Sequence, residues 1–188
     1  MKQKVLLLHG WGGSDNPHWQ SWLAGEIAKD YGNVNFLQFS NFDNPDIKVW
    51  QEELIEALES YKPDIVICHS LANTLWFHLC NTQSIKKKIQ KLILVAPPSL
   101  ECNIEELKSF FPLKTPTELY AEKSILVTST DDPYMSMQEA KSLQKNLNIE
   151  MLVLENAGHI NADSGYGVWE WIYNEVKSSS KQELSTDS

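Results

Sequence analysis

Ser70 stands where an apolar run ends and a run that can start a helix begins. The residues before it, Ile65–Cys68, are apolar, and His69 lies directly before the serine. A strand that turns sharply into a helix at a serine is typical of a nucleophile elbow. Cys68 and Ala72 replace the two glycines of the usual Gly-x-Ser-x-Gly pattern, and Cys68 lies two positions before the turn, which excludes it as the nucleophile. We interpret Ser70 as a nucleophile, and the alternative is a helix N-cap.

A serine hydroxyl needs a base before it can attack a carbonyl carbon, and His159 is the candidate. A carboxylate bonded to the other imidazole nitrogen would orient the ring and stabilise its positive charge. Two adjacent aspartates, Asp131 and Asp132, stand in a turn after an apolar run. Adjacent side chains point in different directions, so only one of them can reach the histidine. Asp163 and Asp15 are alternatives with weaker placement.

The negative charge that develops on a substrate oxygen needs N–H donors that are already in place. The natural pair is the backbone N–H of Leu71, immediately after the nucleophile, and that of Trp11 in the glycine-rich loop His9–Ser14. These two groups are the predicted oxyanion hole. We expect His9 to be a structural hydrogen-bonding residue beneath this loop and His69 to pack beside the elbow.

The elements that must position these residues alternate along the chain. Six short apolar runs are predicted to be strands, and several are apolar on both faces, as buried parallel strands are: Lys4–Leu8, Val34–Gln38, Asp64–Ile67, Leu92–Val95, Ser124–Thr128 and Met151–Leu154. Six longer stretches between them are predicted to be helices: Trp19–Tyr31, Asp46–Tyr61, Leu71–Cys80, Ile104–Phe111, Ser136–Leu147 and Tyr166–Lys177. This alternation predicts an α/β fold with a sheet of about six mainly parallel strands and helices on both faces. Ser70, Asp132 and His159 each follow a predicted strand, in the chain order stated for α/β-hydrolases.

Charge and cysteine content exclude several classes of partner. Sixteen basic and 25 acidic residues give a formal net charge of −9 at pH 7, which argues against nucleic acid and against an anionic membrane surface. The scattered cysteines and the histidines outside the loops show no spacing suited to a disulfide framework or a metal, so we expect no metal and no other cofactor: Cys68, Cys80, Cys102, His18 and His78. No signal peptide or membrane span is visible, which favours the cytoplasm. Residues 1–177 are predicted to form one domain, and residues 178–188 a disordered tail.

Four motifs carry these candidates: His9–Gly13, Cys68–Ala72, Ser129–Tyr134 and Gly158–Gly167. Together they resemble the small serine hydrolases related to retinoblastoma-binding protein nine and to the bacterial YdeN-like proteins, over almost the whole chain. The resemblance implies a compact α/β-hydrolase with little or no lid that cleaves small esters, with amides as a second substrate class. In that family the second aspartate of the Asp-Asp-Pro turn is the acid of the triad, which implies Asp132.

The substrate side of the predicted site leaves alternatives open. The stretch Pro97–Tyr120 is predicted to be either a short cap over Ser70 or an ordinary crossover helix on the sheet. Trp11 is expected to form a pocket wall against an apolar acyl or aromatic group. A different function, a non-catalytic protein-binding or scaffold protein on a hydrolase fold, would need no nucleophile. The presence of serine, histidine and aspartate together favours the enzyme.

Overall fold

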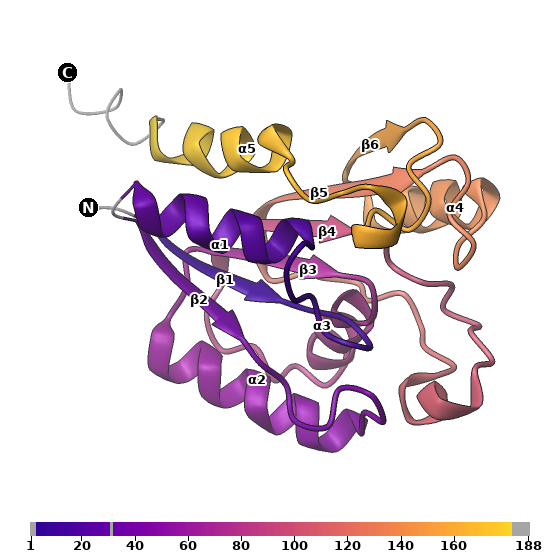
Figure 1. Cartoon of the computed structure of the whole chain (residues 1–188). Helices are drawn as coiled ribbons and strands as arrows, with labels where there is room; N and C mark the ends of the chain where they lie inside the picture. The colour runs from indigo at the N-terminus through magenta and orange to yellow at the C-terminus, as the bar shows by residue number, and fades with distance from the viewer. Residues whose placement is uncertain (1–2, 31, 182–188) are drawn as a thin grey trace.

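The computed structural model describes residues 3–30 and 32–181. Its strands form one sheet with the order β2-β1-β3-β4-β5-β6, and every neighbouring pair is parallel (Figure 1). The strands are β1 (Lys4–Leu8), β2 (Asn33–Leu37), β3 (Ile65–His69), β4 (Ile89–Val95), β5 (Ala121–Ser129) and β6 (Glu150–Leu154). The strand order reverses between β1 and β3, so the carboxyl ends of these two strands form the crevice where α/β sheets bind ligands. The predicted α/β class is confirmed.

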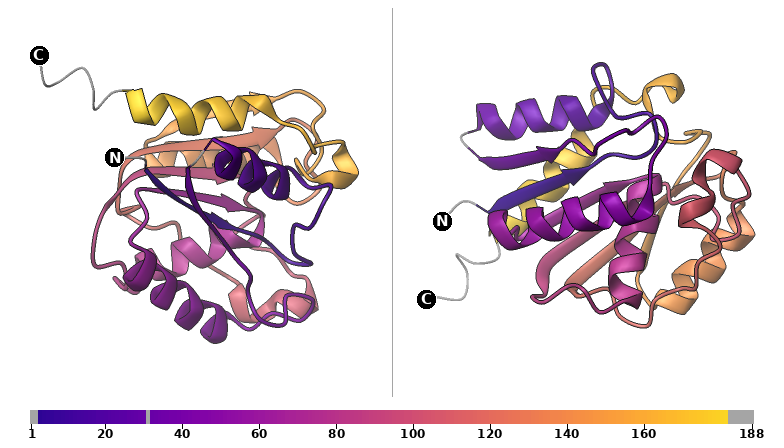
Figure 2. Two further views of the ribbon diagram at one scale, coloured as in Figure 1. Left: turned by 60° about the vertical axis from the view of Figure 1, so that its left-hand side comes forward. Right: turned by 90° about the horizontal axis from the view of Figure 1, so that it is seen from below.

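Helices cover both faces of the sheet (Figures 1 and 2). The first face carries α1 (Trp19–Lys29) and α5 (Glu170–Lys181), whereas the second carries α2 (Ile47–Tyr61), α3 (Leu71–Asn81) and α4 (Met137–Leu147). Each group of helices buries an apolar stripe against the sheet. The result is two hydrophobic cores, one on each side.

The inner strands explain why the sheet is buried on both faces. Successive side chains of a strand point to opposite sides. In β1, Leu6 and Leu8 therefore enter the core beneath α2 and α3, while Val5 and Leu7 enter the core beneath α1 and α5. All four side chains are almost completely buried. An apolar run without polar alternation is the pattern that such a position requires.

Two helices begin with side-chain caps that their sequences contain. Ser136 and Glu139 form a reciprocal capping box at the start of α4. The Asp46 carboxylate accepts hydrogen bonds from the N–H groups of Lys48 and Val49 at the start of α2. These caps satisfy backbone donors that a helix leaves without partners in its first turn.

Several element bounds differ from those predicted. Pairing of Ile89 with Ala121 extends β4 and β5 toward their amino ends, because sheet hydrogen bonds continue past the purely apolar runs. The expected helix within 104–111 is a 3₁₀ helix, η1 (Glu105–Phe110). A second 3₁₀ turn, η2 (Ala162–Ser164), precedes α5, which starts later than predicted.

The carboxyl terminus of α5 also differs from the prediction. The helix continues to Lys181, so residues 178–181, predicted as part of a disordered tail, are helical. The rest of that predicted tail, 182–188, and Tyr31 of the first predicted helix lie outside the described residues. None of the helices within the described ranges is long and apolar enough to cross a membrane.

Candidate active site

Ser70 occupies the sharp turn between β3 and α3. Its backbone has φ 53° and ψ −123°, and its side chain makes no capping hydrogen bond to α3. A non-glycine residue with positive φ is strained by about 1–3 kcal/mol, and such strain is concentrated at functional sites. Ser70 thus occupies the N-cap position of α3 without capping the helix through its side chain, and its hydroxyl is available to other groups.

Asn73 stabilises this strained turn from within α3. Its side-chain amide donates hydrogen bonds to the carbonyl oxygens of Ser70 and Val95, both at 2.8 Å. Asn73 is completely buried, and Ser70 also donates its own N–H to the Val95 carbonyl at 3.0 Å. The sequence interpretation missed this residue. Its one signal is an asparagine in the first turn of a mostly apolar helix, a position where a buried amide needs partners.

Small residues around Ser70 allow the glycine-rich loop to approach the elbow. A Cβ atom added at Gly10 would lie 2.7 Å from Ser70 Cβ and 3.1 Å from the backbone nitrogen of Leu71. Cys68 and Ala72 are completely buried in the core beside α3. Burial raises the pKa of the Cys68 thiol well above its usual value, so it remains protonated. The buried space at positions 68 and 72 thus holds the small side chains of Cys68 and Ala72 where the usual elbow motif has glycines.

Ser70, His159 and Asp132 form a continuous hydrogen-bonded chain. His159 Nε2 lies 2.8 Å from Ser70 Oγ, and His159 Nδ1 lies 3.0 Å from each carboxylate oxygen of Asp132. The Asp132 side chain is fully buried, and the His159 side chain is 9% exposed. With Nδ1–H donating to the carboxylate, Nε2 is free to accept the serine proton. The structure thus brings together the three residues predicted from sequence.

The neighbouring carboxylate, Asp131, bonds to groups other than His159. Its Oδ1 atom accepts hydrogen bonds from the Ser129 hydroxyl at 2.7 Å and from the Gly158 N–H at 2.8 Å. These bonds, that of Ser129 first, lower the pKa of Asp131. Asp131 therefore ties the turn after β5 to the loop that carries His159. Neither Asp163 nor Asp15 contributes a hydrogen bond to His159, whose Nδ1 contacts among the described residues are with Asp132.

The loop that carries His159 is constrained on both sides of the histidine. Gly158 has φ 53° and Ile160 has φ 50°, a rare conformation for a β-branched residue. Trp19 Nε1 donates to the Ile160 carbonyl at 2.8 Å, and the Ser164 hydroxyl accepts the N–H of His159 at 3.2 Å. Asn161 in turn accepts hydrogen bonds from Ser164. The Gly-His-Ile-Asn-Ala-Asp-Ser-Gly block is thus a self-bonded loop that fixes the imidazole.

Buried imidazoles lie behind His159. His69 Nε2 lies 3.1 Å from the His159 carbonyl oxygen, and the rings of His69 and His18 have centroids 4.8 Å apart. Burial lowers the pKa of His69 well below 6.5 and that of His18 to about 4; the second cause is repulsion from a neighbouring imidazole, which is His18 for His69 and His159 for His18. Both rings are therefore neutral near pH 7, and His69 donates its Nε2–H to the His159 carbonyl.

His9 has the structural role predicted for it beneath the glycine-rich loop. Its Nε2 atom accepts the N–H of Phe39 at 3.0 Å, so its Nδ1–H donates to the Gly10 carbonyl at 2.7 Å. Burial lowers the pKa of His9, which keeps this tautomer neutral. His9 thereby holds Gly10 against the elbow.

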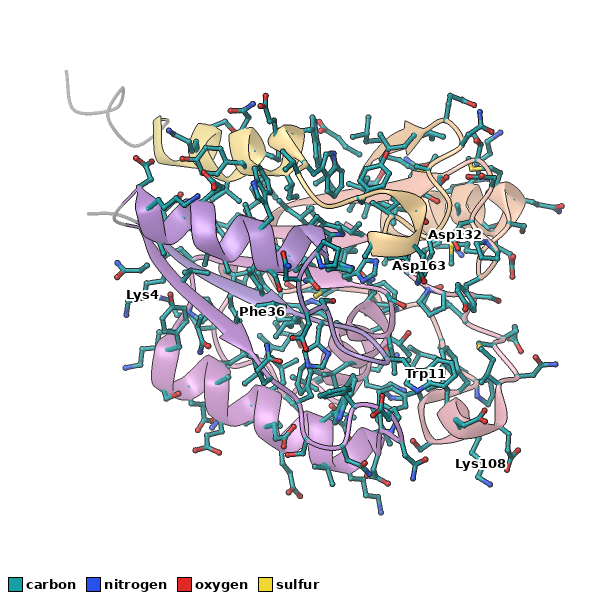
Figure 3. The ribbon with its side chains drawn as sticks, viewed as in Figure 1. Lys4, Trp11, Phe36, Lys108, Asp132 and Asp163 are labelled. Atoms are coloured by element: carbon teal, nitrogen blue, oxygen red, sulfur yellow. The ribbon has the colours of Figure 1, made fainter. Side chains whose placement is uncertain are left out.

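A small cavity connects the candidate residues. Its volume is about 70 Å³, and its lining comprises Trp11, Ser70, Leu71, Pro98, Cys102, Ile104, Leu107, Tyr134 and His159. In the described part of the chain, the backbone N–H groups of Trp11 and Leu71 donate to no other atom. The Trp11 indole is fixed by a 2.9 Å hydrogen bond to the Asp43 carbonyl oxygen. Figure 3 shows Trp11 at the same edge of the molecule as Asp132.

Other features of the surface do not compete with this cavity. A much larger hollow, of about 910 Å³, lies where β4, β5 and β6 begin, and none of the candidate residues lines it. Within the described ranges, no three histidine, cysteine or acidic side chains converge as a metal site would require. The chemistry-bearing residues are gathered at the carboxyl edge.

Sequence and structure comparisons agree on the relatives of this chain. A sequence profile described as serine hydrolase matches residues 5–178. YdeN of Bacillus subtilis (strain 168) is 21% identical over 184 residues, which cover 95% of this chain and 96% of YdeN. The crystal structure of the ydeN gene product has a TM-score of 0.79 at 18% identity and covers 94% of this chain and 98% of its own.

Two further solved structures share the fold. A YdeN-like protein of Pectobacterium atrosepticum has a TM-score of 0.75 at 23% identity, covering 93% of this chain and 89% of its own. The esterase domain of a Rhodothermus marinus protein has a TM-score of 0.66 at 12% identity, with coverages of 96% and 87%. Because the profile extends over nearly the entire chain, the protein belongs to the serine hydrolase family.

Proposed function

We propose that this protein hydrolyses small carboxylic esters, with amides as a second substrate class, through Ser70, His159 and Asp132. One observation carries the proposal: the unbroken hydrogen-bonded chain from the Ser70 hydroxyl through the imidazole to the Asp132 carboxylate. Such a chain is the arrangement that activates a serine hydroxyl at neutral pH. Membership of the serine hydrolase family supports the same reaction.

The first half of the reaction forms an acyl-enzyme. Ser70 Oγ attacks the carbonyl carbon of the ester while its proton moves to Nε2 of His159. Asp132 stabilises the resulting imidazolium through Nδ1–H. The tetrahedral intermediate then collapses, the bond from the carbonyl carbon to the alcohol oxygen breaks, and His159 returns the proton to that oxygen. An alcohol leaves, and Ser70 carries the acyl group.

The second half of the reaction uses water in place of the alcohol. The water oxygen attacks the acyl carbon while His159 takes a proton from the water. The bond between that carbon and Ser70 Oγ breaks, and the proton passes from His159 to the serine. A carboxylic acid is released, and the starting state of the enzyme is restored.

The oxyanion formed in both halves needs hydrogen-bond donors. We assign this role to the backbone N–H groups of Leu71 and Trp11, which have no acceptor among the described residues and belong to residues lining the cavity beside Ser70. One such donor typically contributes roughly 2.7–4 kcal/mol to the stability of the transition state. The N–H of Leu71 also points from the first turn of α3, where the helix dipole favours negative charge.

A fluorophosphonate probe tests this proposal together with the turnover of p-nitrophenyl acetate. The wild-type protein should be labelled and should release p-nitrophenol, whereas Ser70→Ala should do neither. His159→Ala should be labelled far more slowly. Ser142→Ala, at an exposed position on α4, is the matched control and should behave as the wild type. Labelling that persists in Ser70→Ala would contradict the mechanism, and an unlabelled wild type would favour the non-catalytic scaffold.

A further inference from the structure

The cavity beside Ser70 is closed by residues that come from far along the chain. Pro98, Cys102, Ile104 and Leu107 all belong to the crossover segment, residues 97–120, that connects β4 to β5. This segment extends beyond the strand tips at the right of Figure 1, and its 3₁₀ helix η1 lies at the edge where Figure 3 labels Trp11 and Lys108. The crossover segment thus forms a wall of the candidate site.

The position of His159 distinguishes the two sides of the cavity. The leaving oxygen of an ester must approach His159 Nε2, because that atom returns the proton. Tyr134 packs against the imidazole with ring centroids 4.6 Å apart, and it is 42% exposed. The leaving group therefore faces Tyr134 and the solvent. The acyl group extends from the other side of the carbonyl carbon, and the lining that remains for it is the side of the crossover segment with Pro98, Cys102, Ile104 and Leu107, together with Trp11.

The whole cavity is small, and the part of its lining that the crossover segment supplies is mainly apolar. Ile104 and Leu107 contribute branched aliphatic side chains, and Leu107 is only 4% exposed. The volume of about 70 Å³ is near half that of an engineered apolar cavity that holds benzene. It accommodates about two to four carbon atoms.

The wall is held firmly in place. Phe110 is completely buried and packs edge-on against Trp50, with ring centroids 5.5 Å apart. Leu113 donates its N–H to the carbonyl of Leu100 at 3.1 Å, which closes the segment into a loop. Ser99 donates its N–H to the Tyr134 carbonyl at 2.8 Å, so the segment is bonded to the turn after β5. A wall anchored in this way cannot retreat readily before a long acyl chain.

We propose that Ile104 and Leu107 limit the acyl group of the substrate to about two to four carbons, while the leaving group is unrestricted on the open side by Tyr134. This specificity rests on the proposed function, because it assigns the acyl side from the position of His159. The crossover segment is therefore both a connection between strands and the specificity-determining part of the site.

A panel of p-nitrophenyl esters with acyl chains from acetate to octanoate tests the proposal, since the leaving group stays constant. For the wild type, kcat/KM should rise by roughly fourfold with each methylene that fits in the cavity and should be highest at two to four carbons. It should fall by more than roughly tenfold at octanoate, because a chain longer than the cavity displaces the ester carbonyl from Ser70 Oγ. Ile104→Ala and Leu107→Ala should each move the optimum about one to three carbons longer. Thermal melting shows which variants remain folded. If Leu107→Ala unfolds, Ile104→Ala still tests the proposal, because Ile104 is less buried and its truncation costs less stability.

Leu113→Ala is the matched control, because Leu113 belongs to the same segment and packs on the same core but does not line the cavity. Its chain-length optimum should equal that of the wild type. A wild-type optimum at six carbons or more, or a shift in Leu113→Ala as large as that in Ile104→Ala, would overturn the pocket assignment alone. If no ester is turned over and Ser70 is not labelled by the fluorophosphonate, the proposed hydrolase function fails and this proposal fails with it.

Discussion

Two regions meet at the carboxyl edge of the sheet, and they are held together by different forces. The acid–base loops, residues 129–134 and 155–165, are held by hydrogen bonds to the side chains of Asp131, Ser129 and Ser164. In the crossover segment, residues 97–120, hydrogen bonds anchor the backbone, but side chains such as Leu107 and Phe110 are held in place by apolar packing. A hydrogen bond restricts both the distance and the angle between its donor and acceptor groups, whereas apolar packing is non-directional.

The difference separates the chemistry of the site from its selectivity. Proton transfer between Ser70 and His159 tolerates little displacement, so its residues sit in a polar network. An acyl pocket needs only the right volume, which apolar side chains of other sizes can change without touching the network. We therefore expect substitutions in the acid–base loops to alter rate, and substitutions in the crossover segment to alter substrate preference.

The largest expected effect separates the two adjacent aspartates of the acid–base loops. Asp132→Asn should lower kcat/KM for p-nitrophenyl acetate by roughly 10⁴-fold, because an amide that donates to Nδ1 imposes the wrong tautomer on His159. Asp131→Asn retains an oxygen that can accept from Ser129 and Gly158, so its loss should remain below about tenfold. Steady-state kinetics on both variants gives the comparison, and the reverse ranking would transfer the role of the acid to Asp131.

The next effect concerns the glycine-rich loop, which lies against the elbow at Ser70. Gly10→Ala should lower kcat/KM by roughly 100-fold, because the added methyl would press on Ser70 Cβ at 2.7 Å and displace the elbow or the loop. The control is Gly25→Ala in α1, where an added Cβ meets nothing within 4 Å. That change should preserve activity and raise stability slightly, as replacing a helical glycine does. Full activity in a folded Gly10→Ala protein would mean that the loop has no part in the reaction.

A third prediction tests the buried imidazoles that support the acid–base loops. The pKa of His18 is about 4 in the folded protein and 6.5 in the unfolded chain, so the unfolded chain binds a proton first as pH falls. Stability is therefore fully present above about pH 6.5 and is lost toward pH 4. Between pH 7.5 and 5 the loss from His18 should be about 2 kcal/mol.

Urea unfolding of the wild type and of His18→Asn at these two pH values measures this contribution. Asparagine retains a side-chain acceptor for the N–H of Gln20 but cannot titrate. The difference in unfolding free energy between pH 7.5 and 5 should be smaller in the variant. An equal difference in both proteins would show that His18 does not contribute.

The smallest effect belongs to the crossover segment. Ser99→Ala removes a 2.6 Å hydrogen bond from the serine hydroxyl to Glu139 but leaves the backbone bond to Tyr134. Because that hydrogen bond is exposed, the free energy of unfolding should fall by about 1 kcal/mol or less, with kcat/KM for acetate within about threefold of the wild-type value. Urea unfolding and steady-state kinetics check both values. A loss in kcat/KM as large as that expected for Gly10→Ala would contradict the separation between the rate-determining and the selectivity-determining regions.

Much of the fold could be predicted from local patterns. The runs in β1 and β3 are apolar on both faces, which requires a sheet covered by helices on both sides. The capping residues of α2 and α4 are visible in the sequence as well. The predictions were weakest where tertiary contacts override pattern, as in the amino ends of β4 and β5 and in the 3₁₀ turn η1.

Parts of the candidate site had little or no local signal. Asn73 resembles any polar residue in a helix until the Val95 carbonyl is seen beside it. Ser129 and Ser164 are ordinary loop serines in the sequence. The Ser129 hydroxyl accepts the N–H of Ala157 from another loop, and the Ser164 hydroxyl accepts the N–H of His159 within its own loop. Such partners are determined by how the strand ends meet.

By itself, the sequence determined which residues could do chemistry and that each follows a strand, because side-chain type and apolar periodicity are local properties. The family resemblance implied Asp132, but only the tertiary structure shows that its carboxylate contacts His159. Only the tertiary structure also decided how closely Gly10 approaches Ser70 and how much space the crossover segment leaves beside the serine. The hydrogen bond between Ser70 and His159 joins residues 89 positions apart in the chain. Such contacts depend on how distant strand ends and loops meet and on the direction of each side chain, which no local pattern encodes.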